Sequence, residues 1–175
     1  KSPNQEIFIP SDISSAAFFM VLGCIRPETS FRITGVGLNP TRDGILKVLK
    51  KMGAEIFTTA EKFDYYEPYG DILVKTSELK NIEIPEEWVP NVIDELPIVA
   101  VAAMFGEGKC IVRGAKELRV KESDRIAGIV NMVRRMGAEV EELEDGFVIE
   151  GGSKMTSFEV DSGGDHRMAM SAIIA

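Results

Sequence analysis

Leu46-Lys47-Val48-Leu49-Lys50-Lys51-Met52-Gly53-Ala54-Glu55-Ile56 and Val130-Asn131-Met132-Val133-Arg134-Arg135-Met136-Gly137-Ala138-Glu139-Val140 are two versions of one pattern in a chain of 175 residues. In each, apolar residues recur at helical spacing and stop at a glycine, after which an alternating stretch begins. Glycine closes many helices because it lacks a Cβ, and alternation is typical of a half-buried strand. The repeated stretch therefore predicts a helix followed by a strand, twice.

The residues upstream of each copy also correspond. Residues 9–19 and 89–99 each read as a strand end, a polar loop and an apolar helix of small residues, and a third such start lies at 158–170. The order predicts an α/β fold, in the wider sense α+β, built from repeated units of strand, helix, strand, helix, strand and strand. We expect units at about 7–80 and 81–152 and a truncated third at 153–175, all in one domain.

Several elements can be placed within this frame. Asp12, Asp94 and Asp165 stand where helices should begin, since a carboxylate suits the first turn; for Asp12, a ligand-binding role remains an equal alternative to a cap. The chain ends inside an apolar pattern, at 169–175, so we interpret the sequence as a fragment of a longer protein. The other expected elements are a helix over 126–136 and strands at 31–34, 71–75, 109–112 and 146–150.

Composition and charge narrow the class of protein. An apolar fraction of 45% and a charged fraction of 27% are ordinary for a globular protein. The formal net charge of -8 argues against a nucleic-acid-binding module. No apolar run approaches the roughly 20 residues of a membrane span, and the first residues do not resemble a signal peptide. Cys24 and Cys110 read as small core residues of a reduced cytosolic protein, although a bridge between them stays open.

The densest charged segment is Glu117-Leu118-Arg119-Val120-Lys121-Glu122-Ser123-Asp124-Arg125. It lies between an expected strand and an expected helix, so one lysine, two arginines and free backbone N–H groups could bind an anion. Glu122 would then be a carboxylate held among cations and suited to proton transfer. The alternative is a solvated charge run in which Ser123 and Asp124 only cap the helix, and composition alone favours that alternative.

Two smaller groups of residues could also carry chemistry. Gly163-Gly164-Asp165-His166-Arg167 contains the only histidine of the chain, beside an arginine whose fork suits phosphate and carboxylate groups. Asp94, with Glu95, begins an apolar helix and is either a proton acceptor partly removed from water or, as an equal alternative, a helix cap or surface acid. Residues 39–44 read as a turn and helix start. No spacing fits a metal site, a catalytic triad or a Walker loop.

Five of these motifs together resemble the 3-phosphoshikimate 1-carboxyvinyltransferase (EPSP synthase) family. The resemblance covers nearly the whole chain, and its most specific parts are the charged loop and the Asp-His-Arg motif. The matching segments are 9–18, 39–42, 93–97, 118–125 and 165–170.

The resemblance implies a fold and a reaction. The fold is an enolpyruvate transferase-like domain, an inside-out α/β barrel in which three repeats surround a pseudo-threefold axis. The reaction moves the enolpyruvyl group of phosphoenolpyruvate to the 5-hydroxyl of shikimate 3-phosphate and releases phosphate, in the biosynthesis of aromatic amino acids. It implies no metal and no organic cofactor. Asp94 matches the carboxylate that contacts the shikimate hydroxyls and accepts a proton, Lys121 contacts shikimate 3-phosphate, and Glu122 exchanges a proton with the methylene carbon of phosphoenolpyruvate.

The remaining site residues follow from the same resemblance. Arg125 and Arg167 match the arginines that hold the carboxylate and phosphate of phosphoenolpyruvate, and His166 lines the same site. Glu117 stands where some family members have an asparagine that contacts the shikimate ligand, so its role is less secure.

The resemblance also implies what accompanies this chain. The family's ligands bind between two domains, so the partners are an N-terminal domain of the same enzyme and the two substrates, with glyphosate as a possible inhibitor. A cytoplasmic location is expected, or a plastid in a plant. The alternative functions are a UDP-N-acetylglucosamine 1-carboxyvinyltransferase, which shares the fold and the donor, and a non-catalytic domain of the same fold. No nucleic acid and no membrane is expected as a partner.

Overall fold

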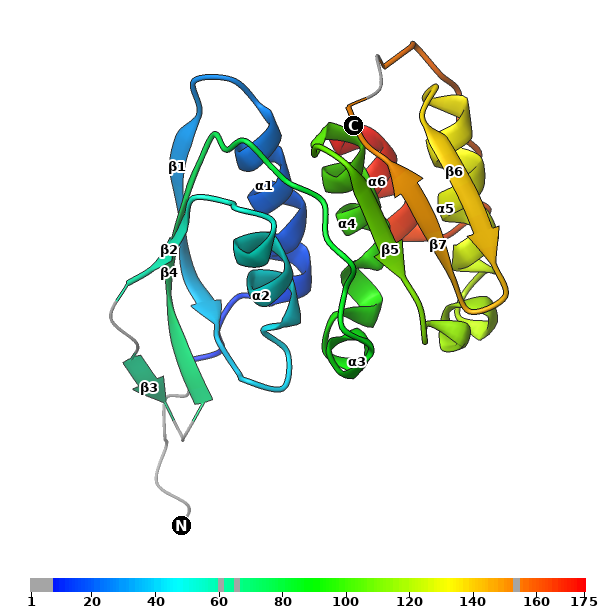
Figure 1. Ribbon diagram of the computed structural model, residues 1–175. Helices are drawn as coiled ribbons and strands as arrows, with labels where there is room; N and C mark the ends of the chain where they lie inside the picture. Colours follow the sequence, from blue (N-terminus) through cyan, green and yellow to red (C-terminus); the bar gives the residue numbers. More distant parts are fainter. Residues whose placement is uncertain (1–7, 60–61, 65–66, 153–154) are drawn as a thin grey trace.

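The computed structural model describes residues 8–59, 62–64, 67–152 and 155–175. Figure 1 shows two groups of strands and helices side by side, the first half of the chain forming one group and the second half the other. The elements are α1 (Ile13–Ile25), β1 (Ser30–Gly37), α2 (Gly44–Lys51), β2 (Ile56–Thr58), β3 (Lys62–Asp64), β4 (Glu67–Lys75), η1 (Glu86–Trp88), α3 (Val89–Val92), η2 (Ile93–Glu95), α4 (Leu96–Phe105), β5 (Lys109–Val112), η3 (Lys116–Val120), α5 (Arg125–Arg135), β6 (Glu139–Leu143), β7 (Gly146–Glu150) and α6 (His166–Ile174).

The two halves contain sheets of the same topology. The first has the order β1-β4-β2, with β3 also paired to β4, and the second has the order β5-β7-β6. The pairings between these strands are antiparallel. In each half a parallel bridge joins the start of the unit to the strand after its first helix, at Ser11–Val36 and at Glu83–Ile111. The expected α/β fold of repeated strand-helix units is confirmed.

The repeated glycines close the two equivalent helices in the same way. Gly53 follows α2 and Gly137 follows α5, and both have φ of 90°. After α2 the N–H of Ala54 donates to the carbonyl of Leu49, and after α5 the N–H of Ala138 donates to that of Val133. These bonds turn the chain directly from helix into strand. The sequence repeat is therefore a repeat of local structure.

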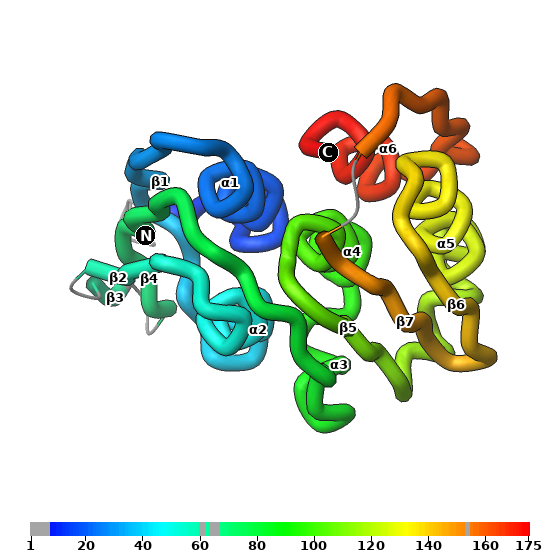
Figure 2. Tube along the Cα trace, turned by 45° about the horizontal axis from the view of Figure 1, so that its top comes forward, coloured from blue at the N-terminus to red at the C-terminus, as the bar shows by residue number. Residues whose placement is uncertain are grey.

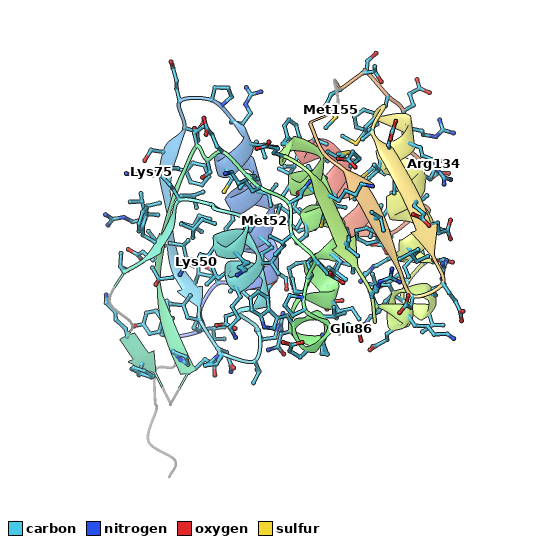
Figure 3. All side chains as sticks on the ribbon, viewed as in Figure 1. Lys50, Met52, Lys75, Glu86, Arg134 and Met155 are labelled. Atoms are coloured by element: carbon cyan, nitrogen blue, oxygen red, sulfur yellow. The ribbon has the colours of Figure 1, made fainter. Side chains whose placement is uncertain are left out.

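Three apolar helices, α1, α4 and α6, form the centre of the molecule. Each contacts the other two, and Figure 2 shows them together between the outer strands. All residues of α4 from Leu96 to Met104 are buried, which suits a helix that is apolar on every side. Side chains fill the space between the two halves, with the fully buried Met52 near the middle of Figure 3 and Arg134 on the outer side of α5.

One stretch has the length and composition of a membrane span. Residues 86–105, counted through η1, α3, η2 and α4, form 20 helical residues, but 67% of the most apolar window is buried inside the protein. The core helix of a globular protein can have the same length and hydropathy as a membrane span, so these two properties do not distinguish them.

The two cysteines are buried and unpaired, and burial raises the pKa of Cys24 to about 11 and that of Cys110 to about 12.

Some strand ends expected upstream of the helices are wrong. Val89 lies in helix α3, because Pro90 stands at the start of that helix, where a missing N–H breaks no hydrogen bond. The unit instead begins with bridges farther upstream, at Lys80 and Glu83. Near the end of the chain, residues 155–160 form no strand. In the first two units the equivalent segment pairs with the strand after the first helix, whereas this chain ends with α6.

Replacing the closing glycine should weaken the fold. In Gly137→Ala an alanine must adopt the left-handed backbone conformation of this glycine, so we expect a loss of about 1–2 kcal/mol in the free energy of unfolding. The matched control is Gly128, within α5, where the atoms nearest to an added Cβ belong to the side chain of Met168, the first of them at 3.5 Å. Gly128→Ala should be neutral or stabilise by up to about 1 kcal/mol. Urea unfolding of both variants checks this, and equal effects would contradict the assigned cap.

Candidate active site

The charged loop ends in a capped helix. The side chain of Asp124 accepts a hydrogen bond from the N–H of Ala127 at 3.0 Å, which fixes the start of α5. A burial penalty opposes ionisation of Asp124, but hydrogen bonds from Ala127 and Arg119 lower its pKa below the ordinary value. The first side chain of α5, that of Arg125, points inward and is only 1% exposed. Capping by Asp124 thus fixes the start of α5 so that the guanidinium of Arg125 lies in the interior of the protein.

Arg125 joins three segments that are far apart in the sequence. Its Nε donates to Asp165 at 2.8 Å, its Nη1 to Asp94 at 3.1 Å and its Nη2 to Glu122 at 2.5 Å. A buried guanidinium is tolerated only when acids and hydrogen bonds replace its water. All three nitrogens of Arg125 are therefore occupied by carboxylates.

Asp165 supports both the arginine and the last helix. It is fully buried and caps α6 by accepting from the N–H groups of Arg167 and Met168, at 2.9 and 3.4 Å. The hydroxyl of Ser123 donates to it at 3.1 Å. Burial would raise the pKa of Asp165, but the hydrogen bonds from Arg125 and Arg167 outweigh burial and lower that pKa below its ordinary value of 3.8. The expected cap at Asp165 is confirmed.

Asp94 is not a helix cap. It lies in the short turn η2, two residues before α4, and neither end of that turn carries a side-chain cap. Its carboxylate lies 3.1 Å from Nη1 of Arg125, 3.9 Å from Nζ of Lys121 and 3.8 Å from Nη2 of Arg167. The cap interpretation is wrong because three cations surround this side chain, which is 37% exposed and can meet a ligand.

The other predicted residues lie at the edge of this cluster. Lys121 is also 3.0 Å from the exposed carboxylate of Glu117 on η3, and Glu122 is 56% exposed although it binds Arg125. Arg167 is more enclosed, at 16% exposed. His166 is the exposed first residue of α6, and within the described part of the chain it makes no hydrogen bond or ion pair. The structure brings six of the seven predicted residues into contact.

Arg119 does not belong to the cluster, contrary to the expected loop with two anion-binding arginines. Its Nη1 donates to Asp124 and Glu142, and its Nε and Nη2 donate to the carbonyls of Glu144 and Leu143. These partners tie the loop to the turn between β6 and β7. A charge run does not reveal which arginine faces which side, so the sequence could not separate the two roles.

A buried acid beside the cluster was not predicted from the sequence. Glu95 is 4% exposed and accepts a short hydrogen bond from the hydroxyl of the buried Ser14. Arg42 donates to the same hydroxyl at 2.9 Å and lies 3.3 Å from Asp12. Asp12 itself caps α1 through the N–H of Ser15, as one of its two interpretations predicted. The position of Glu95 before a wholly apolar helix was the one available signal of its burial.

The arrangement suits an anionic ligand. Lys121, Arg125 and Arg167 approach Asp94 from two different segments, and the N-terminal ends of α1, α4 and α6 meet beside them, where helix dipoles favour negative charge. A pocket lined by Thr41, Arg42, Asn91, Ile93 and Asp94 among others opens next to the cluster. Within the described residues no group of three His, Cys, Asp or Glu side chains could hold a metal ion. The chemistry open to these side chains is anion binding and proton transfer.

The ion pair of Asp165 should make stability depend on pH in a specific way. Because its pKa is lowered by folding, its stabilising effect is present above about pH 4 and is lost as the pH falls through the folded value. We expect Asp165→Asn to reduce the free energy of unfolding by about 2–4 kcal/mol at pH 7 and by less near pH 3. Urea unfolding at both pH values measures this difference, with the exposed Asp161→Asn as control. A difference that does not change with pH would contradict the assignment.

Comparisons with known proteins agree with this geometry. The sequence model of the family described as EPSP synthase (3-phosphoshikimate 1-carboxyvinyltransferase) matches residues 1–175. The 3-phosphoshikimate 1-carboxyvinyltransferases of Desulforamulus reducens and Carboxydothermus hydrogenoformans are 49% and 51% identical to the chain, over 98% and 97% of its length. The chain spans 40% of the length of each.

A solved structure shows the same fold. The EPSP synthase of Acinetobacter baumannii superposes on 96% of this chain with a TM-score of 0.93 and 44% sequence identity, and the match covers 40% of that protein. The chain belongs to the EPSP synthase (3-phosphoshikimate 1-carboxyvinyltransferase) family.

Proposed function

We propose that this chain carries half of the active site of an enzyme that transfers the enolpyruvyl group of phosphoenolpyruvate to the 5-hydroxyl of shikimate 3-phosphate. The observation that carries the proposal is the meeting of Asp94, Lys121, Glu122, Arg125 and Arg167 at one site. The names of the relatives support this acceptor and not UDP-N-acetylglucosamine.

The cations would hold the two polyanionic substrates. Arg167 and Lys121 each keep donors that no carboxylate of the cluster occupies within hydrogen-bond distance, apart from the bond from Lys121 to Glu117. Arg125 is different, since all its nitrogens are engaged. Because Asp165 is buried and Glu122 is half exposed, an incoming anion would displace Glu122 from Arg125 more easily than it would displace Asp165. Binding would therefore also free Glu122 near the ligand.

The freed carboxylate would have a role in the chemistry. The oxygen of the 5-hydroxyl bonds to C2 of phosphoenolpyruvate while its proton goes to a base, and a proton added to C3 makes a methyl group. The resulting tetrahedral intermediate then loses a methyl proton and phosphate, which restores the double bond. Asp94 would accept the hydroxyl proton, Lys121 would hold the acceptor's phosphate, and Glu122 would give and retake the proton at C3. Each of these roles requires the side chain to be held in a fixed position relative to the substrates, and the shared ion pairs would hold it there.

The proposal extends to the partners and to the location of the chain. The remaining contacts would come from a second domain of the same enzyme, His166 and Glu117 would line the site without a catalytic role, and no cofactor would be required. Glyphosate, which carries a carboxylate and a phosphonate, would compete for the same cations. We place the enzyme in the cytoplasm, where the two unpaired cysteines would stay reduced.

Substitution of the two proton-transferring acids tests the proposal. In the full-length parent enzyme, Glu122→Gln and Asp94→Asn should each lower kcat by about 10²–10⁴-fold, because general acid–base catalysis contributes that much. The control is Glu144→Gln, a side chain 82% exposed in the turn between β6 and β7. Phosphate release in the presence of both substrates measures turnover. Near-normal turnover in either acid variant would refute the role proposed for that acid.

The isolated chain should bind poorly and not turn over. Residues 1–175 carry cations for the ligands but no second domain to close over them, so we expect no phosphate release by the purified chain. Phosphoenolpyruvate added to this chain should still shift the NMR signals of Arg167, with those of the exposed Arg26 as reference. A non-catalytic domain of this fold would show no such shift. Steady turnover by the isolated chain would refute the proposal that it carries only half of the active site.

A further inference from the structure

Glu95 is a buried acid that the proposed chemistry does not use. It follows Asp94 directly and precedes α4, and only 4% of it is exposed. Burial raises the pKa of its carboxyl group, against the hydrogen bond from Ser14 and the charge of Arg167. An acid in such a place costs stability unless a partner compensates it, and an apolar residue would fill the same space at less cost. Its presence therefore requires a role.

The partners of Glu95 come from the two other central helices. The hydroxyl of Ser14, at the start of α1, donates to Oε1 and accepts in turn from Nη2 of Arg42 at 2.9 Å. Because Ser14 has one hydroxyl proton and Arg42 uses the acceptor side, the direction of both bonds is fixed. On the other side Nη1 of Arg167, in α6, lies 3.8 Å from the same Oε1. Glu95 is thus held by α1 and faces the arginine of α6.

The contacts of Arg167 are divided between the two ends of its guanidinium. Nη1 donates to the backbone carbonyl of Asp94 at 3.2 Å and faces Glu95. Nη2 lies 3.8 Å from the carboxylate of Asp94, which is beyond hydrogen-bond distance, and that carboxylate is 37% exposed. This contrasts with Arg125, whose three nitrogens all bind carboxylates. Arg167 is anchored at one nitrogen and keeps the other for a ligand.

We propose that Glu95 is a positioning residue for Arg167: its carboxylate, fixed by Ser14, holds Nη1 so that Nη2 faces the anionic group of phosphoenolpyruvate. This inference rests on the proposed function. An arginine side chain loses considerable rotamer freedom when it binds an anion, and an anchor that restricts it beforehand reduces that cost. Glu95 therefore acts on the affinity for the donor and not on the proton transfers.

The test is the Glu95→Gln variant of the full-length enzyme. The amide keeps the size of the side chain and an acceptor for Ser14 but loses the charge that attracts Arg167. We expect the KM for phosphoenolpyruvate to rise by about 3–10-fold, the cost of leaving one side chain unrestrained. The kcat and the KM for shikimate 3-phosphate should stay within about 2-fold, because neither depends on the anchor. If Glu95 acted only as a nearby negative charge, its removal would strengthen anion binding and lower this KM, which would overturn the proposal.

A second variant and a double-mutant cycle keep the test independent of folding. Ser14→Ala removes the hydroxyl that orients Glu95 and should raise the same KM by about 2–5-fold. In an Arg167→Lys background, Glu95→Gln should have no further effect, since the two residues act together. Additive effects would refute the link between them. An inactive wild-type enzyme would refute the proposed function itself, whereas an active wild type with an unchanged KM in both variants would refute only the role of Glu95.

Discussion

The site depends on the hydrogen-bonded ion pairs that the buried guanidinium of Arg125 makes with three carboxylates. It joins the start of α5 to Asp94 before α4 and to Asp165 before α6, and those residues in turn place Lys121, Glu122 and Arg167. A charge so deeply buried is stable only with its acids in place. The same requirement brings three segments of the chain, around Asp94, Arg125 and Asp165, to one point. The fold and the site therefore depend on the same contacts.

The central helices explain why the site lies at this end of the molecule. α1, α4 and α6 pack against one another, and their first residues contact across the units through Ser14, Glu95 and Arg167. Helix N-termini that gather in this way favour negative charge, which suits polyanionic ligands. The strands lie on the outer sides of these helices (Figure 2). Equivalent positions in repeated units thereby supply different side chains to a single site.

Local features of the fold could be predicted from the sequence, whereas contacts between side chains that are far apart in the sequence could not. Gly53 and Gly137 close helices because of backbone geometry, which depends on a few neighbouring residues, so the repeat was readable. From the sequence alone Asp94 can be a proton acceptor, a cap or a surface acid, because the cations that surround it lie elsewhere in the chain. Arg119 and Arg125 looked equivalent within one charge run, although one ties a turn and the other is buried. The burial of Glu95 cannot be predicted locally, because it arises from packing against Ser14 and Arg167 in other units.

A crystal structure of the full-length parent enzyme with shikimate 3-phosphate and a stable analogue of phosphoenolpyruvate would test the central claim most directly. We predict anionic oxygens of the ligands within hydrogen-bond distance of Lys121, Arg125 and Arg167, with Glu122 moved from Arg125 toward the methylene carbon and Asp165 unmoved. Ligands bound away from these cations, or a complex in which Arg125 keeps all three carboxylates, would contradict that claim.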